Sequence, residues 1–372
     1  MKLGIVLTGG GARAAYQVGV LRALYELTHQ HRHLLDVITG NSAGAINATY
    51  IASYAHDLDY ATKTLVDMWK SLSPQDVFDL RKRVLTELGM RWISGTVFGG
   101  MTKSGSNVNH LLDTTPLRKL LSERIDFKRI NDNIKNGTIS GIALSTTNYS
   151  SGSSVVFHNT HKEIPDWSRS DRFSQKAEMT IEHLMASAAI PFFFPPEKIG
   201  DSYYGDGCVR QTTPFSPAIH LGADKIIGIG IRYPHPREKM KELAFAPAPE
   251  PAIGRIAGVM LNAIFLDSME ADYERMKKIN ELIEKQAYPE FRQIPIFMIR
   301  PSKDLGKMTE KLNKELPASL RYLLKGIGVS GNEGLDLLSY LAFDSSYTEA
   351  LIEIGYEDTL KQGPQLLEFM SS

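Results

Sequence analysis

The sequence predicts an α/β fold built on a mostly parallel, doubly wound central sheet, and two stretches near the N-terminus carry this prediction. Residues 3–8 form an unbroken apolar run that ends in three glycines, and residues 12–27 then repeat apolar side chains at helical spacing. Residues 34–39 form a second apolar run, followed by a helical pattern after Ser42. Buried parallel strands are apolar throughout, and strands that alternate with helices are typical of doubly wound sheets.

Later segments extend this pattern. Further strands are expected at residues 139–144, 154–158, 225–231 and 294–299, and a long helix is expected at 253–285. Two regions interrupt the alternation: residues 79–106 mix basic and aromatic side chains, and residues 244–251 are proline-rich and favour a linker or a helix lead-in. We therefore expect a catalytic domain over 1–235 and a mainly helical C-terminal extension over 236–372, with strand 294–299 packing back on the sheet.

Composition narrows the function and the compartment. The chain has 372 residues, and its 42 Lys and Arg balance 42 Asp and Glu, which disfavours nucleic acid as the main partner. The single cysteine, Cys208, excludes an intrachain disulfide and fits a reducing compartment. The first apolar run is too short for a signal peptide, and no stretch approaches membrane-spanning length. We expect a cytoplasmic protein and leave peripheral membrane contact open.

The first glycine loop, residues 9–14 (GGGARA), satisfies the dinucleotide fingerprint G-x-G-x-x-A. That motif also requires an acidic residue at the end of the second strand, whereas Asp36 stands at its beginning; a second match at 326–331 follows a helical stretch. Dinucleotide binding is therefore disfavoured. Free N–H groups at a helix N-terminus can instead hold an oxyanion, with Arg13 adding positive charge, or the glycines can serve tight packing alone.

Ser42 is the candidate nucleophile. It lies in Gly40-Asn41-Ser42-Ala43-Gly44, a G-x-S-x-G motif placed between an apolar strand and a helix. This context is typical of a nucleophile elbow, in which a sharp turn exposes the serine Oγ; a structural serine is the alternative.

A nucleophilic serine needs a base, and the sequence offers few. His220 and His235 come late enough in the chain for a triad, but neither lies beside a motif, and the histidines at 29–33 favour a solvated turn over a metal site. Asp206 is the better candidate, in the chain's one Asp-Gly pair. The same pair is also typical of a hairpin turn.

Taken in order, these motifs resemble the patatin-like phospholipase family. Its G-G-G-x-R/K-G loop, G-x-S-x-G elbow and D-G-G/A motif correspond to Gly9–Arg13, Gly40–Gly44 and Asp206-Gly207-Cys208. Residues 186–191 and the phenylalanines and prolines of 192–196 resemble a further family segment. Ala14 and Cys208 replace residues that are commonly glycine or alanine, and a positive φ at position 208 would strain cysteine.

The resemblance implies a patatin-like three-layer α/β/α fold and a Ser-Asp dyad that needs no metal and no cofactor. Ser42 would be the nucleophile and Asp206 its base. The residues expected to form the oxyanion hole are Gly9, Gly10, Gly11, Ala12, Arg13 and Ala43, with Arg13 adding a positive charge nearby. Phe192, Phe193 and Phe194 are candidates for an acyl pocket, and plain core packing is the alternative.

The function expected from the sequence is a serine acyl hydrolase of the phospholipase A or lysophospholipase type, acting on phospholipid or other acyl-ester lipids. Two alternatives stay open: an acyltransferase that uses the same dyad, and a non-catalytic lipid-binding module. Residues 79–106 are a candidate lid or interfacial segment, because basic residues beside Trp and Phe suit anionic lipid surfaces. A homodimer is a further possibility.

Overall fold

A computed structural model of the chain describes residues 1–28, 35–79, 109–247, 250–286, 291–310 and 334–371. At its centre lies a ten-stranded sheet with the strand order β10-β9-β1-β2-β3-β4-β6-β5, to which β8 adds by pairing with β3, and β7 by pairing with β8. The five strands in the order β10-β9-β1-β2-β3 run parallel to one another, and β3 is antiparallel to β4 and β8. The expected mostly parallel α/β sheet is confirmed.

The described elements have the following bounds. The strands are β1 (Leu3–Leu7), β2 (Val37–Gly40), β3 (Gly141–Asn148), β4 (Ser154–Thr160), β5 (Ser168–Arg169), β6 (Arg172–Lys176), β7 (Glu197–Ile199), β8 (Ser202–Asp206), β9 (Lys225–Ile229) and β10 (Ile296–Ile299). The α-helices are α1 (Ala15–Thr28), α2 (Ala43–Ser53), α3 (Leu58–Lys70), α4 (Pro74–Val77), α6 (Thr115–Arg124), α7 (Phe127–Lys135), α8 (Ile181–Ser187), α9 (Ser216–His220), α10 (Arg237–Phe245), α11 (Ile253–Phe265), α12 (Asp267–Lys285), α14 (Leu335–Leu341), α15 (Ser345–Lys361) and α16 (Gly363–Ser371). Short 3-10 helices are η1 (Gly11–Ala14), η2 (Gly207–Val209) and η3 (Lys307–Glu310).

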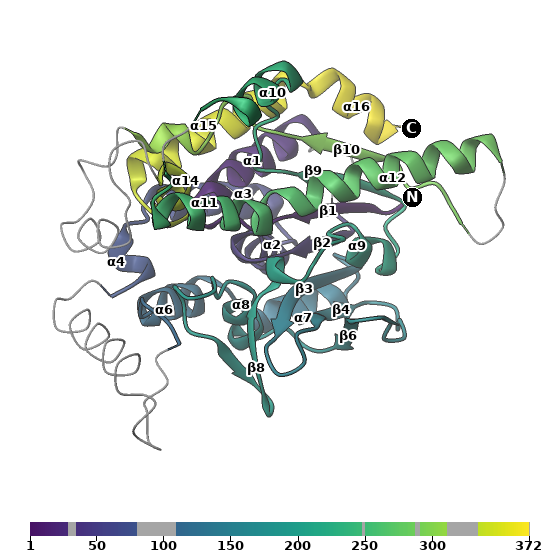
Figure 1. Ribbon diagram of the computed structural model, residues 1–372. Helices are drawn as coiled ribbons and strands as arrows, with labels where there is room; N and C mark the ends of the chain where they lie inside the picture. The colour runs from purple at the N-terminus through teal and green to yellow at the C-terminus, as the bar shows by residue number, and fades with distance from the viewer. Residues whose placement is uncertain (29–34, 80–108, 248–249, 287–290, 311–333, 372) are drawn as a thin grey trace.

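The helix expected over residues 253–285 is two helices. Leu266 separates α11 from α12 with φ of −106°, and the two helices follow one another across the face seen in Figure 1. The break lets Phe265 and Leu266 join the larger apolar core, while Met269, a few residues later, packs into the second core on the other side. A straight amphipathic helix would present all three side chains to one neighbouring surface.

The C-terminal residues are built into the body of the protein. β10 pairs in parallel with β9 at the edge of the sheet, and α15 packs along α1. The packing of these two helices brings backbone against backbone: a Cβ on Gly19 would lie 1.8 Å from the Ile352 carbonyl oxygen, and one on Gly355 would lie 2.1 Å from that of Tyr16. Two glycines on facing helices therefore permit this close approach.

Three segments singled out in the sequence are covered little or not at all by the described part of the structure. The interfacial segment at 79–106, the histidines at 29–33 and the second glycine motif at 326–331 lie wholly or almost wholly outside the described residues. Within the described part of the chain, none of the helices combines the length and the apolar character needed to cross a bilayer.

Candidate active site

Ser42 stands on a sharp turn between β2 and α2. It is the N-cap of α2 and has φ of 54° and ψ of −131°, a conformation that non-glycine residues rarely adopt. The flanking glycines are required by space: a Cβ on Gly40 would lie 2.6 Å from the Ala45 Cα, and one on Gly44 would lie 2.4 Å from the Leu7 carbonyl oxygen. The strained turn therefore has the geometry of a nucleophile elbow.

A chain of two hydrogen bonds holds this elbow in place. The Ser42 backbone N–H donates to Ser187 Oγ at 3.1 Å, and the Ser187 hydroxyl donates to the Ser145 carbonyl at 2.7 Å. Ser187 ends α8 and is fully buried, and Ser145 lies in β3. Because Ser42 N–H is satisfied in this way, it is not a donor for an oxyanion.

Asp206 ends β8 and is held by its backbone and its side chain. Its N–H donates to the Ala189 carbonyl at 3.1 Å, and its own carbonyl accepts from Thr147 Oγ1 at 2.7 Å. Its Oδ1 accepts from the Cys208 N–H at 2.9 Å. The residue is fully buried, and this burial raises the pKa of the Asp206 carboxyl from 3.8 to about 7.

The second carboxylate oxygen of Asp206, Oδ2, is not engaged by the backbone donor that holds Oδ1. The Ser42 hydroxyl is near enough to lower the Asp206 pKa against the larger effect of burial. Oδ2 is buried, and no described residue makes a hydrogen bond of standard geometry to it. The Ser42 hydroxyl and the Cys208 thiol both lie near enough to this carboxyl to lower its pKa by hydrogen bonding, and the hydroxyl is the stronger donor of the two. Contacts between catalytic groups commonly tighten only when substrate binds.

The glycine loop lies directly against this pair. A Cβ on Gly9 would come within 2.4 Å of the Ser42 Cβ and 2.6 Å of the Cys208 sulfur. Gly11 has φ of +54°, and η1 begins there. The first N–H groups of a helix have no acceptor within it, so those of Gly11 and Ala12 in η1, and of Ala43 in α2, are the loop's candidate oxyanion donors.

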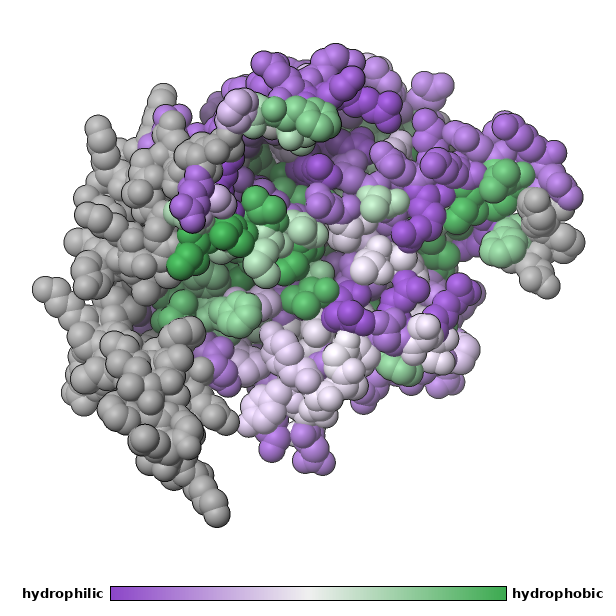
Figure 2. Space-filling model, viewed as in Figure 1, coloured by the Kyte–Doolittle hydropathy of each residue, from purple (hydrophilic) through white to green (hydrophobic). Residues whose placement is uncertain are grey.

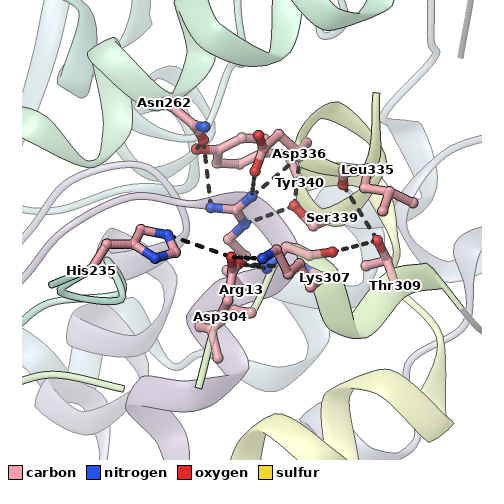
Figure 3. A network of polar contacts seen from close by, with 12 residues as sticks. Arg13, His235, Asn262, Asp304, Lys307, Thr309, Leu335, Asp336, Ser339 and Tyr340 are labelled. Carbon is pink, nitrogen blue, oxygen red and sulfur yellow. Dashed lines mark hydrogen bonds and ion pairs between the residues drawn. The ribbon is translucent and has the colours of Figure 1, made fainter. Parts of the chain in front are cut away.

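Arg13 differs from the expectation that it adds charge to an oxyanion site. Its N–H donates to the Gly10 carbonyl at 3.1 Å, and its guanidinium points toward α14 (Figure 3). There it donates to Ser339 Oγ at 2.7 Å and pairs with Asp336 Oδ1 at 2.8 Å, over the Tyr340 ring. Arg13 thus anchors the glycine loop to the C-terminal helices, because a buried guanidinium needs such partners.

A buried polar network supports the loop from behind. The Gln17 side chain donates to the Thr8 carbonyl at 2.7 Å, at the end of β1, and accepts from Asn47 Nδ2 at 3.0 Å. Asn47 also donates to the Ala14 carbonyl at 3.1 Å and accepts from Trp69 Nε1 at 2.8 Å. This network joins α1, α2 and α3 just beneath the residues that carry Ser42 and the loop.

The remaining candidates lie elsewhere. His220 stacks on Trp167 with ring centroids 4.4 Å apart, and His235 lies 3.6 Å from the Asp304 carboxylate (Figure 3). Neither contact involves Ser42 or Asp206. Phe193 and Phe194 are buried in the larger core, whereas Phe192 is 70% exposed. An acyl pocket at these phenylalanines stays a prediction.

Two local expectations are settled by backbone geometry. Asp206-Gly207 is not a hairpin turn: it joins β8 to η2, and the hairpin of β8 turns at its other end, toward β7. Cys208 and Ala14 both lie in 3-10 helix rather than at positive φ, so neither substitution strains the backbone. Cys208 is buried beside Asp206, and this burial raises the pKa of its thiol.

Sequence reasoning missed the role of Ser187. Residues 186–191 resemble a family segment, but the sequence alone does not indicate what Ser187 contacts. The signal was a small polar residue among alanines at the end of a helix, which becomes meaningful only when β3 and α2 are brought together. Ser145 and the Gln17–Asn47 network gave no signal of comparable strength, since their roles depend on long-range contacts.

Comparison with known proteins gives one family and several solved structures. Residues 5–219 match the family described as patatin-like phospholipase. Similar structures include VipD from Legionella pneumophila (14% identity, TM-score 0.34, covering 95% of this chain and 67% of that one). Human GIVD cytosolic phospholipase A2 is also similar (12% identity, TM-score 0.37, 97% and 60%). The chain therefore spans about three fifths of the human enzyme's length. No curated protein sequence matched.

Proposed function

The chain belongs to the patatin-like phospholipase family, and from this membership we propose that it hydrolyses lipid acyl esters with Ser42 as nucleophile and Asp206 as the base. The observation that carries the proposal is the pairing itself. A serine on a strained elbow adjoins a buried carboxyl whose Oδ2 makes no hydrogen bond of standard geometry with any described residue, and the Cys208 thiol beside this carboxyl is a weaker donor than the serine hydroxyl. A carboxylate held in this way gains its best hydrogen bond by accepting the proton of Ser42.

The reaction runs in two halves. Ser42 Oγ attacks the ester carbonyl while its proton passes to Asp206, and the resulting oxyanion lies against the free N–H groups of η1 and α2. Collapse of this intermediate breaks the ester C–O bond, Asp206 returns the proton to the departing alcohol, and the acyl group stays on Ser42. A water that gives its proton to Asp206 then attacks the acyl-serine. As the bond from the acyl carbon to Ser42 Oγ breaks, Asp206 passes this proton to Ser42 Oγ, which releases the fatty acid and restores the free serine.

Burial makes Asp206 a better base than an ordinary carboxylate. An exposed aspartate with its usual pKa accepts a proton weakly at neutral pH, whereas the burial of Asp206 raises its pKa to about 7. Activity governed by this group should therefore fall as pH drops below about 7, since protonated Asp206 cannot accept the proton of Ser42.

Hydrolysis of a medium-chain nitrophenyl ester tests the dyad. Ser42→Ala and Asp206→Asn should each lower kcat by at least about a hundredfold, in line with the loss of a nucleophile or a general base. His220→Ala and His235→Ala are matched controls and should retain activity. Loss of activity in a folded histidine variant would replace the dyad with a triad.

We further propose that α11 brings the protein to a lipid surface. Its exposed side chains are largely apolar, with Ile253 71%, Val259 61% and Met260 56% exposed, and Figure 2 shows green residues gathered on this face. An exposed apolar helix face of this kind suits insertion at the edge of the acyl region. α11 also supplies Asn262, whose side-chain oxygen accepts from the Arg13 guanidinium at 3.5 Å.

Vesicle flotation tests this contact. Val259→Asp with Met260→Asp should reduce recovery with phosphatidylcholine vesicles, while Lys277→Asp on the exposed side of α12 serves as the charge-change control. If flotation is equal in all three proteins, α11 is not the contact. Hydrolysis of the soluble nitrophenyl ester should be unchanged in the double variant.

A further inference from the structure

A cavity of about 650 Å³ opens on the face of the sheet that carries the second core. It lies between β4, β6, α9 and α12, which occupy one region of Figure 1, where α12 runs over α9. The volume is within the range of about 300–1,000 Å³ that small-molecule sites occupy. Neither Ser42, nor Asp206, nor the first glycine loop is among its lining residues.

The lining of the cavity is rich in cations. Arg169, Arg172, Arg275 and Arg292 all line it, and the one lining carboxylate is Asp272. Arg292 is already paired with Asp224, which lies outside the lining. Asp272 is already held, since its Oδ1 accepts from Arg275 at 3.2 Å and its Oδ2 from the Phe215 N–H at 3.1 Å. The balance of charge in the lining therefore favours an anionic ligand.

Arg172 and Ser154 are two of the lining groups with hydrogen-bond donors left for a ligand. Arg172 uses one N–H on Thr213 Oγ1, at 2.6 Å, out of the five donors of a guanidinium. Ser154 lies at the inner wall, fully buried, and its hydroxyl has no hydrogen-bond partner among the described residues. A buried hydroxyl without a partner is unusual and is explained where a ligand or water completes it.

The lining also contains a group of aliphatic side chains. Met276 and Ile279 lie one turn apart on α12, and Ile219 and Ile294 face the same space from α9 and from the segment before β10. Trp167 also lines the cavity, but its indole already stacks with His158 at 4.9 Å and with His220 at 4.4 Å. These stacks disfavour a planar aromatic ligand and favour a flexible apolar chain.

We propose that this cavity is a second ligand site, which binds a single-chain amphiphile with an anionic head group. Arg169 and Arg172 would hold the head group, since guanidinium pairs with carboxylate or phosphate through charge-assisted bonds. The chain would lie along Met276 and Ile279. Two kinds of amphiphile carry such a head group: a free fatty acid has a carboxylate, and a lysophosphatidate has a phosphate.

The cavity is connected to Ser42 through Gln211, Ser145 and Ser187 and does not include Ser42 in its lining. Gln211 lines the cavity, donates from Nε2 to Ser145 Oγ at 3.2 Å and donates from its backbone N–H to the Gly207 carbonyl at 3.1 Å. Binding in the cavity therefore does not depend on the chemistry at Ser42. The proposal stands or fails separately from the proposed hydrolase function.

Quenching of Trp167 fluorescence by a brominated long-chain fatty acid measures this binding, with Trp167→Phe to identify the signal. Removing both head-group contacts in Arg169→Gln/Arg172→Gln should weaken binding by at least about tenfold. Arg237→Gln/Lys239→Gln, on the exposed α10, removes the same charge elsewhere and should bind as wild type. Ile279→Asp places a carboxylate where the apolar chain would lie and should weaken binding by at least about tenfold without adding a tryptophan.

Competition and an inactive variant complete the test. Displacement by unlabelled fatty acid or by lysophosphatidate supports the proposal and tells the two head groups apart, whereas equal displacement by neutral monoacylglycerol contradicts it. Equal affinity in wild type and Arg169→Gln/Arg172→Gln also overturns it. Ser42→Ala should retain the quenching; if quenching is lost there, the ligand occupies the active site instead.

Discussion

The buried Asp206 carboxyl should make the protein less stable at high pH, and Asp206→Asn should remove that effect. The native state holds the Asp206 proton up to about pH 7, whereas the unfolded chain releases it near pH 4. Between these values the native state binds more protons than the unfolded state, so the free energy of unfolding falls as pH rises. This direction is opposite to that of a salt-bridged aspartate.

The size of this change in stability follows from the difference between the native and unfolded pKa of Asp206. A difference of about three pKa units corresponds to about 4 kcal/mol, of which about 3 kcal/mol develops between about pH 5 and pH 9. Asparagine has the same shape and keeps the Oδ1 contact with the Cys208 N–H, but it does not ionise. Relative to wild type, Asp206→Asn should therefore gain about 3 kcal/mol of stability across this interval.

Urea unfolding at a series of pH values gives the required free energies. The difference between Asp206→Asn and wild type is followed against pH, so any constant effect of the substitution cancels. Ser42→Ala keeps Asp206, so its stability should also fall as pH rises, with the fall displaced to higher pH because the Ser42 hydroxyl lowers the Asp206 pKa. A stability difference that stays constant from about pH 5 to pH 9 would show that Asp206 is not a buried carboxyl with a raised pKa.

Three further substitutions test the frame around the site. Ser187→Ala leaves the Ser42 N–H and the Ser145 carbonyl unsatisfied, so unfolding measurements should show a loss of about 1–3 kcal/mol, with kcat reduced more than KM changes; an unchanged kcat would contradict the positioning role. Gly11→Ala should lower the free energy of unfolding by several kcal/mol and abolish ester hydrolysis, because its Cβ would lie 2.1 Å from the Tyr340 carbonyl oxygen. Gly152→Ala, also at positive φ but in open space, should lower it by only about 1 kcal/mol. Equal losses of stability in the two variants would contradict this packing. Arg13→Lys keeps the charge but loses the guanidinium fork, so hydrogen exchange over 334–341 should accelerate; unchanged exchange would mean that this contact does not anchor α14.

The elements around the site were predictable because their signals are local. An apolar run that ends in glycines identifies β1, and the small residues of Gly40–Gly44 identify the turn after β2. The importance of Asp206 was predictable from the sequence, but its local backbone structure was not. The Asp-Gly pair is typical of a hairpin turn, whereas Asp206 lies between β8 and η2. Sheet pairing between β8 and β3 decided that position.

What the sequence could not supply depends on contacts between distant segments. The Arg13 guanidinium meets Ser339 more than 300 residues later, so its role as an anchor was not visible from the glycine loop alone. The same holds for Ser187 and for the break at Leu266, which reflects two cores on opposite faces of the sheet. Periodicity within a helix reports which face is apolar but not how many surfaces it must meet.

The dyad itself is tested most directly by the rate at which a long-chain fluorophosphonate labels the protein, with the modified residue located by peptide mass spectrometry. Wild type should carry one adduct, on Ser42, and Asp206→Asn should label at least about a hundredfold more slowly because the serine has lost its base. An adduct on another residue, or labelling of Asp206→Asn at the wild-type rate, would contradict the Ser42–Asp206 mechanism.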